Sequence, residues 1–151
     1  MSFKVNIYIA TTWTSPRQKG GKAMWLVEFI KKDNTPATRQ GIVVTEGKEM
    51  EAILTALKEA VSILTKSCTI RGFMRRNGVL NAYQNSWIKK WQKNDFRSSK
   101  GVGVAHEEKW RELIAELDKH QYEFIEGLGE YELYMRNELA KSVDFPLKEG
   151  E

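Results

Sequence analysis

The residues with the clearest chemical potential lie between positions 87 and 100, where basic side chains alternate with aromatic ones. Basic side chains neutralise the phosphates of a nucleic-acid backbone, and neighbouring aromatic rings can pack on its sugars. The residues concerned are Trp87, Lys89, Lys90, Trp91, Lys93, Phe96, Arg97 and Lys100. The same pattern also fits tryptophans that anchor a helix to the core and lysines that face solvent. A nucleic-acid duplex is therefore one candidate partner, and a structural role for the segment is the other.

A second basic cluster lies at the end of a predicted central strand, at a place where α/β sheets often bind ligands. It consists of Arg71, Arg75 and Arg76. Other reactive residue types form no recognisable site. Cys68 is the only cysteine, and we expect it to be a small buried apolar residue. The histidines His106 and His120 lack the spacing of metal ligands.

The composition predicts one globular domain over residues 1–151. The chain is 41% hydrophobic and 29% charged, with a formal net charge of +4. A mild basic excess permits nucleic-acid binding without requiring it. The N-terminal segment alternates apolar and polar residues, so we expect neither a signal peptide nor a membrane span. A single cysteine suits a reducing compartment, and we expect the protein in the cytoplasm.

The first half of the chain changes from a strand pattern to a helix pattern. Alternating apolar residues predict strands at 3–10, 23–32 and 37–46, joined by turns as an antiparallel meander. Apolar residues spaced by three and four then predict a helix at 48–66. A β-like segment at 68–74 gives the next strand, parallel to the strand that precedes the crossover helix.

The second half of the chain is mainly helical. The spacing of its apolar residues predicts helices at 77–93, 107–120 and 131–142, with a strand at 122–125. A polar, glycine-bearing loop fills 93–103. The resulting order, β-β-β-α-β-α-α-β-α, predicts an α/β fold with a mixed sheet and helices on both faces.

This order and several sequence landmarks together resemble the bacterial single-domain type of ribonuclease H. The resemblance covers nearly the whole chain. The segments that carry it are VNIYIATTW, GKEMEAILTALKEAV, CTIRGFMR, NSWIKKWQKNDFRSSKG, HEEKWRELIAEL and MRNELAK. It implies the ribonuclease H-like fold, a five-stranded mixed sheet whose first three strands are antiparallel. It also implies that residues 87–100, here called the basic protrusion, grip the backbone of an RNA–DNA hybrid.

The family's chemistry depends on carboxylates that hold magnesium ions, since hard divalent cations need oxygen ligands. The resemblance places these positions at Ala10, Glu49, Arg75 and Asn137. Only Glu49 is a carboxylate, and the family's usual loop histidine is missing near Gly127 or Leu128. We therefore expect a degenerate active site, no bound metal and no other cofactor. Other carboxylates that could rebuild a site are Glu46, Glu51, Glu126, Glu130, Glu132 and Asp144, for which solvated surface charge is the simpler interpretation.

Arg75 is the largest departure from the family pattern. Two unit charges about 4 Å apart interact by roughly 4 kcal/mol at an effective dielectric constant near 20, so a guanidinium would strongly repel a divalent cation. We expect Arg75 instead to form a salt bridge with Glu49 in the vacated metal site. Asn137 would complete this network from the last helix.

Three functions remain open at this point. The first is a catalytically inactive domain that binds RNA–DNA hybrid or another duplex through the basic protrusion. The second is a protein-interaction or structural domain whose basic surface is incidental. The third is a metal-dependent ribonuclease H that cleaves the RNA of hybrids. Salt-dependent binding separates the first two, and magnesium-dependent cleavage identifies the third.

Overall fold

A five-stranded sheet forms the centre of the molecule in the computed structural model, which describes residues 3–15, 17–31, 33–97 and 103–141. Its strands, in chain order, are β1 (Phe3–Thr11), β2 (Gly21–Ile30), β3 (Pro36–Thr45), β4 (Cys68–Met74) and β5 (Gln121–Glu126). The spatial order is β3-β2-β1-β4-β5. The first three strands are antiparallel, and β4 is parallel to both β1 and β5. The predicted mixed sheet is therefore confirmed.

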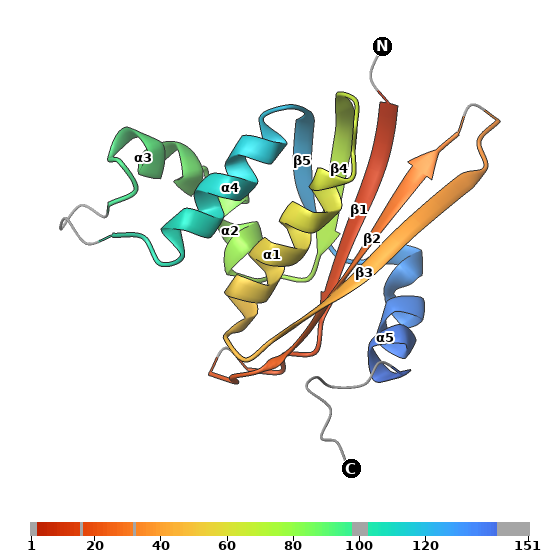
Figure 1. Cartoon of the computed structure of the whole chain (residues 1–151), viewed down its shortest axis with the longest axis horizontal. Helices are drawn as coiled ribbons and strands as arrows, with labels where there is room; N and C mark the ends of the chain where they lie inside the picture. The colour runs from red at the N-terminus through yellow and green to blue at the C-terminus, as the bar shows by residue number, and fades with distance from the viewer. Residues whose placement is uncertain (1–2, 16, 32, 98–102, 142–151) are drawn as a thin grey trace.

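Helices cover both faces of this sheet (Figure 1). On one face, α1 (Glu49–Ser62) crosses the strands and packs against α4 (Glu107–Leu117). On the other face, α5 (Glu132–Lys141) packs on β1 and β2 after a short 3₁₀ turn at Gly129–Tyr131. Alternate residues of β1 supply the two cores, with Ile7 facing α1 and Tyr8 facing α5. Among the described residues, no helix has the length and apolar character needed to cross a membrane.

The predicted helix at 77–93 is wrong, because the structure has two helices there. They are α2 (Gly78–Gln84) and α3 (Trp87–Lys93). Ser86 separates them with a φ of 59°, a left-handed conformation that no α-helix of L-residues can continue through. The break lets α3 leave the direction of α2 and project from the body of the molecule (Figure 1).

A buried carboxylate ties the α5 side of the molecule to the sheet. Glu28 is only 6% exposed. It accepts hydrogen bonds from Asn6 Nδ2 at 2.9 Å, the Tyr131 hydroxyl at 2.8 Å and the Tyr8 hydroxyl at 3.4 Å. These donors offset the cost of taking a carboxylate out of water. The rings of Tyr8 and Tyr131, with centroids 4.9 Å apart, complete the contact.

This network predicts a loss of stability in alkali. Burial, followed by the neighbouring Glu28 carboxylate, raises the pKa of Tyr8 and of Tyr131 to about 12. A pKa raised on folding stabilises the protein fully below the unfolded value near 10, and this contribution is lost as the pH rises through 12. The free energy of unfolding, measured in urea, should therefore fall between pH 10 and pH 12. The fall should be shallower in Tyr131→Phe and unchanged in Tyr134→Phe, whose hydroxyl bonds to Gln40 at the surface. Equal slopes in all three proteins would contradict this assignment.

Candidate functional site

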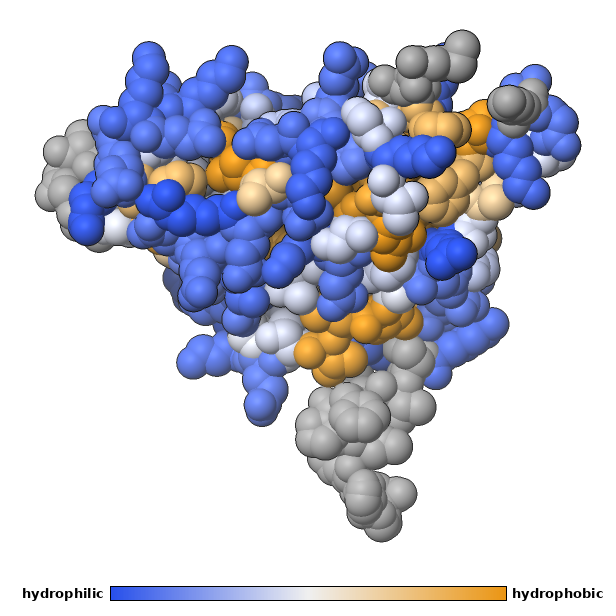
Figure 2. All heavy atoms as spheres, turned by 45° about the horizontal axis from the view of Figure 1, so that its top comes forward, coloured by the Kyte–Doolittle hydropathy of each residue, from blue (hydrophilic) through white to orange (hydrophobic). Residues whose placement is uncertain are grey.

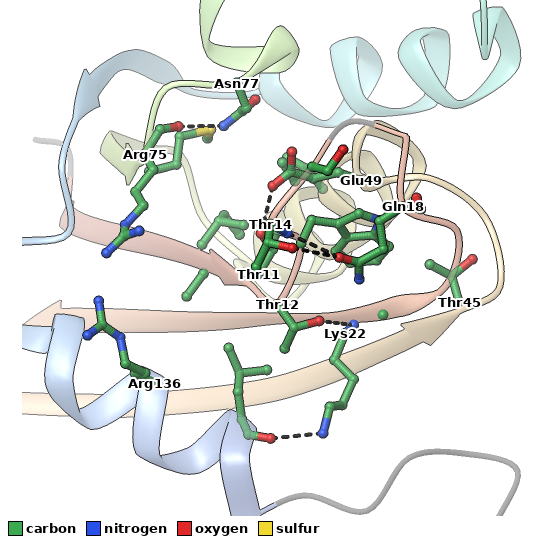
Figure 3. A pocket seen from close by; sticks show the side chains of 18 of the residues that line it. Thr11, Thr12, Thr14, Gln18, Lys22, Thr45, Glu49, Arg75, Asn77 and Arg136 are labelled. Atoms are coloured by element: carbon green, nitrogen blue, oxygen red, sulfur yellow. Dashed lines mark hydrogen bonds between the residues drawn. The ribbon is translucent and has the colours of Figure 1, made fainter.

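An open groove of about 910 Å³ lies where β1 and β4 end, and it is the first candidate site. Its walls come from the end of β1 with the turn that leads into β2, the start of β2, the end of β3, the start of α1, the residues after β4, and α5. Figure 3 shows many of the side chains that line it. The charged members are Lys22, Glu46, Glu49, Arg75, Arg76, Glu132 and Arg136. The groove thus joins residues from distant parts of the sequence at the carboxyl ends of the central strands.

The groove brings together three of the four positions that the sequence assigned to one site. Ala10, Glu49 and Arg75 all line it, although they come from β1, α1 and the end of β4. The expectation fails for Asn137, which is exposed on α5 and does not line the groove. Its neighbour Arg136 lines the groove instead, because adjacent residues of a helix point about 100° apart.

The predicted salt bridge between Arg75 and Glu49 is wrong. Arg75 Nη2 donates to Glu132 Oε2 at 2.5 Å, and Arg136 Nη2 donates to the same oxygen at 2.6 Å. Glu49 Oε2 accepts a hydrogen bond from the Thr11 hydroxyl at 2.7 Å. Figure 3 shows the Arg75 side chain directed towards α5 and away from the start of α1. Each carboxylate therefore has a partner on its own side of the groove.

Glu132, whose carboxylate two arginines share, has a larger role than the solvated surface charge expected from the sequence. The hydrogen bond from Arg75, supported by the charges of Arg75 and Arg136, lowers the pKa of Glu132 below its usual range. The spacing of Glu132 and Arg136 by four residues was a usable signal, because such pairs meet on one face of a helix. Nothing in the sequence spacing pointed to the third member, Arg75.

Carboxylates are scarce and dispersed in this groove. In the described parts of the chain, no three histidine, cysteine, aspartate or glutamate side chains gather closely enough to hold a metal ion. Of the carboxylates considered as substitutes, Glu46 and Glu132 line the groove, and Glu51 accepts a 3.4 Å hydrogen bond from the Thr45 hydroxyl. Asp144 lies outside the described residues.

The basic protrusion is the second candidate site. Lys89, Lys90 and Lys93 are exposed along α3, and the surface over this helix, at the left of Figure 2, is mostly hydrophilic. Arg97 is also exposed, and its backbone pairs with Gly103. Lys100 lies outside the described residues.

The two tryptophans of the protrusion have different environments. Trp91 is half-buried and packs edge-on against the fully buried Trp110, with ring centroids 5.0 Å apart. Trp87 is 39% exposed, and its ring lies near that of Trp91 on the same helix. Buried Ile88 lies on the same helix. Trp91 is therefore an anchor of α3, whereas Trp87 presents an open aromatic surface.

This difference predicts unequal effects of truncation. Trp91→Ala removes a ring that packs against the core and should lower the free energy of unfolding by about 2 kcal/mol, somewhat less than for a fully buried tryptophan. Trp87→Ala should cost less than about 1 kcal/mol. Urea unfolding of the two variants, followed by tryptophan fluorescence and circular dichroism, measures both values. Equal losses would show that the two rings anchor α3 alike.

Comparison with known proteins places this architecture in a family. No protein-family model matches the chain. The chain is 31% identical over 115 residues to the ribonuclease H of Thermoanaerobacter sp. strain X514, covering 76% of this chain and 70% of that protein. It is 26% identical over 134 residues to the ribonuclease H of Moorella thermoacetica, covering 87% of each. Against the ribonuclease H of Clostridium botulinum strain Hall, the match is 29% over 96 residues and spans 64% of that protein.

Solved structures support the same fold. The described fold matches LC9-RNase H1, a type 1 RNase H with the type 2 active-site motif, with a TM-score of 0.69 at 14% identity. That match covers 86% of this chain and 65% of the other. A foamy viral protease-reverse transcriptase in complex with dsDNA matches with a TM-score of 0.59, also at 14% identity, over 93% and 90% of the chains. With the relative from Thermoanaerobacter and the five-stranded sheet, these findings show that the chain belongs to the ribonuclease H family and has its fold.

Proposed function

We propose that this member of the ribonuclease H family binds RNA–DNA hybrid or another nucleic-acid duplex and does not cleave it. The observation that carries the proposal is the composition of the groove at the strand ends. The resemblance to the family places two of its carboxylate positions at Ala10 and Arg75, and both residues line this groove. Glu49 is the one family carboxylate that remains there.

The side chains present in the groove do not fit a pair of magnesium ions. Such a pair needs several carboxylates close together, and Glu49 and Glu132 are each already hydrogen-bonded to other groups. Arg75 and Arg136 add two positive charges beside Glu132. At about 4 Å, each would oppose a divalent ion by roughly twice the 4 kcal/mol estimated for two unit charges. Hydrolysis through two metals has no support in this arrangement.

Duplex binding is proposed for the basic protrusion. Lys89, Lys90 and Lys93 present three exposed charges on one short helix, and anchoring by Trp91 holds this helix against the core. Fixed positive charges of this kind bind phosphates with little sequence preference. Arg97, Lys100 and the open ring of Trp87 would extend the same contact.

A paired binding and cleavage assay tests the proposed function. An RNA–DNA hybrid, a double-stranded RNA and a double-stranded DNA are each incubated with the protein at two salt concentrations, with magnesium or manganese. We expect binding that weakens steeply with salt and no cleavage products. Metal-dependent cleavage that disappears in Glu49→Gln would overturn the loss of activity. Absence of binding at low salt would favour a protein-interaction domain instead.

A further inference from the structure

We infer that the groove binds a phosphate group directly between Arg75 and Arg136, without a metal ion. The inference rests on the proposed function only in requiring that the groove holds no magnesium. It assigns a second anion site, separate from the basic protrusion. The ligand chemistry is a phosphate monoester or diester oxygen, either on a nucleic-acid backbone or on a free phosphate.

The first support is an imbalance of charge at the α5 side of the groove. Two guanidiniums share one carboxylate, that of Glu132, so this trio carries one uncompensated positive charge. The side chains of Arg75 and Arg136 are 65% and 60% exposed, which leaves both open to a ligand. An anion that approaches here is attracted by two cations and repelled by one carboxylate.

The second support is the number of unused donors. A guanidinium has five N–H groups, arranged to bind two oxygens of a phosphate in parallel. Within the described parts of the chain, Arg75 and Arg136 each donate to the protein through Nη2 alone. Figure 3 shows the two side chains on facing walls, with their guanidiniums pointing towards the same region. Nε and Nη1 of each residue thus remain for an oxygen-rich ligand.

The neighbouring charges limit where the anion can lie. Glu49 is held by Thr11 at the start of α1, and Figure 3 places it on the opposite side of the groove from the arginine pair. Arg76 is already engaged, since it donates to Asn81, Gln84 and Glu126, each at 2.8 Å. The phosphate site is therefore the space beside Arg75 and Arg136, and Arg76 is not part of it.

Glu132 has a distinctive role in this arrangement, because its negative charge repels an anion beside the two arginines and its carboxylate holds Nη2 of each. Removing its charge should strengthen phosphate binding. A purely structural ion pair predicts no such gain. Glu132→Gln therefore separates the two interpretations.

The test is a titration of the 151-residue chain with inorganic phosphate in the presence of a chelator, followed by backbone amide chemical shifts. Shifts should concentrate at Arg75, Arg136 and their neighbours. Arg75→Gln and Arg136→Gln should each weaken binding roughly tenfold, the value of one charge-assisted hydrogen-bonded pair. Glu132→Gln should tighten it about two- to fivefold. The matched control is Arg71→Gln, which removes the same charge from an exposed position of β4 outside the groove.

A second ligand identifies the source of the phosphate, and a control variant separates the groove from the basic protrusion. A dinucleoside monophosphate supplies only a backbone diester, so tighter binding than inorganic phosphate indicates nucleic acid, and weaker binding indicates a free phosphate. Lys89→Ala/Lys90→Ala/Lys93→Ala should leave phosphate binding in the groove unchanged, even where duplex binding is lost. Equal weakening by Arg71→Gln and Arg75→Gln, or no gain in Glu132→Gln, would overturn the site while leaving duplex binding by the protrusion intact. Thermal unfolding of each variant confirms that it is folded.

Discussion

Replacing Lys89, Lys90 and Lys93 together by Ala should weaken binding to an RNA–DNA hybrid by up to roughly five-hundredfold near 0.1 M salt. Each lysine that neutralises one phosphate releases about 0.9 of a counterion from a B-form duplex, so each contributes nearly a decade of affinity at this salt concentration. The dependence of log K on log salt should become shallower by up to about three units. Fluorescence anisotropy at several salt concentrations measures both effects. All duplex sequences should be affected alike, because phosphate contacts carry no base information.

The control for this variant must remove the same charge elsewhere. Lys4, Lys31 and Lys119 are exposed and lie outside the protrusion. Their combined replacement by Ala should reduce affinity only slightly through the lower net charge. Ala is also a good helix former, so α3 should persist in the protrusion variant, and circular dichroism checks this. Unchanged affinity in the protrusion variant would support the protein-interaction alternative.

The sheet could be predicted from the sequence because its signals are local. Successive side chains of β1, such as Ile7 and Tyr8, lie on opposite faces of the sheet, and this two-residue period can be recognised in the sequence alone. The helix stripe of α1 is equally local. The break at Ser86 could not be predicted, because a left-handed serine has no sequence signature and depends on how α3 packs.

The groove was only partly predictable, because its contacts depend on distances between elements. The resemblance correctly grouped Ala10, Glu49 and Arg75. The partner of Arg75, however, depends on how α5 lies across the sheet, and sequence spacing carries no such information. The same limit applies to the tryptophans, since only the orientation of α3 separates Trp91, which packs against the core, from Trp87 at the surface.

The combination Ala10→Asp/Arg75→Asp should create a magnesium site in the groove. It changes the charge there by three units and removes the guanidinium nearest to the strand ends. With Glu46, Glu49 and Glu132, the groove would then present five carboxylates, the kind of ligand set that hard divalent cations need. Asn137 needs no change, because it does not line the groove. Magnesium should raise the stability of this variant by about 1.4 kcal/mol when its concentration is ten times the dissociation constant.

The single variants and a charge-matched control make this expectation specific. Ala10 is only 8% exposed, so Ala10→Asp alone buries a carboxylate in a groove that Arg75 also lines and should show no stabilisation by magnesium. Ala105→Asp/Arg71→Asp makes the same charge change at exposed positions outside the groove and should not respond either. Without metal, the groove double variant should be less stable than the parent protein, because its carboxylates repel one another and the Arg75–Glu132 pair is lost. Thermal unfolding with and without magnesium measures each case. If magnesium stabilises the parent protein as much as the double variant, the natural groove already binds metal, and the proposed loss of catalysis would have to be abandoned.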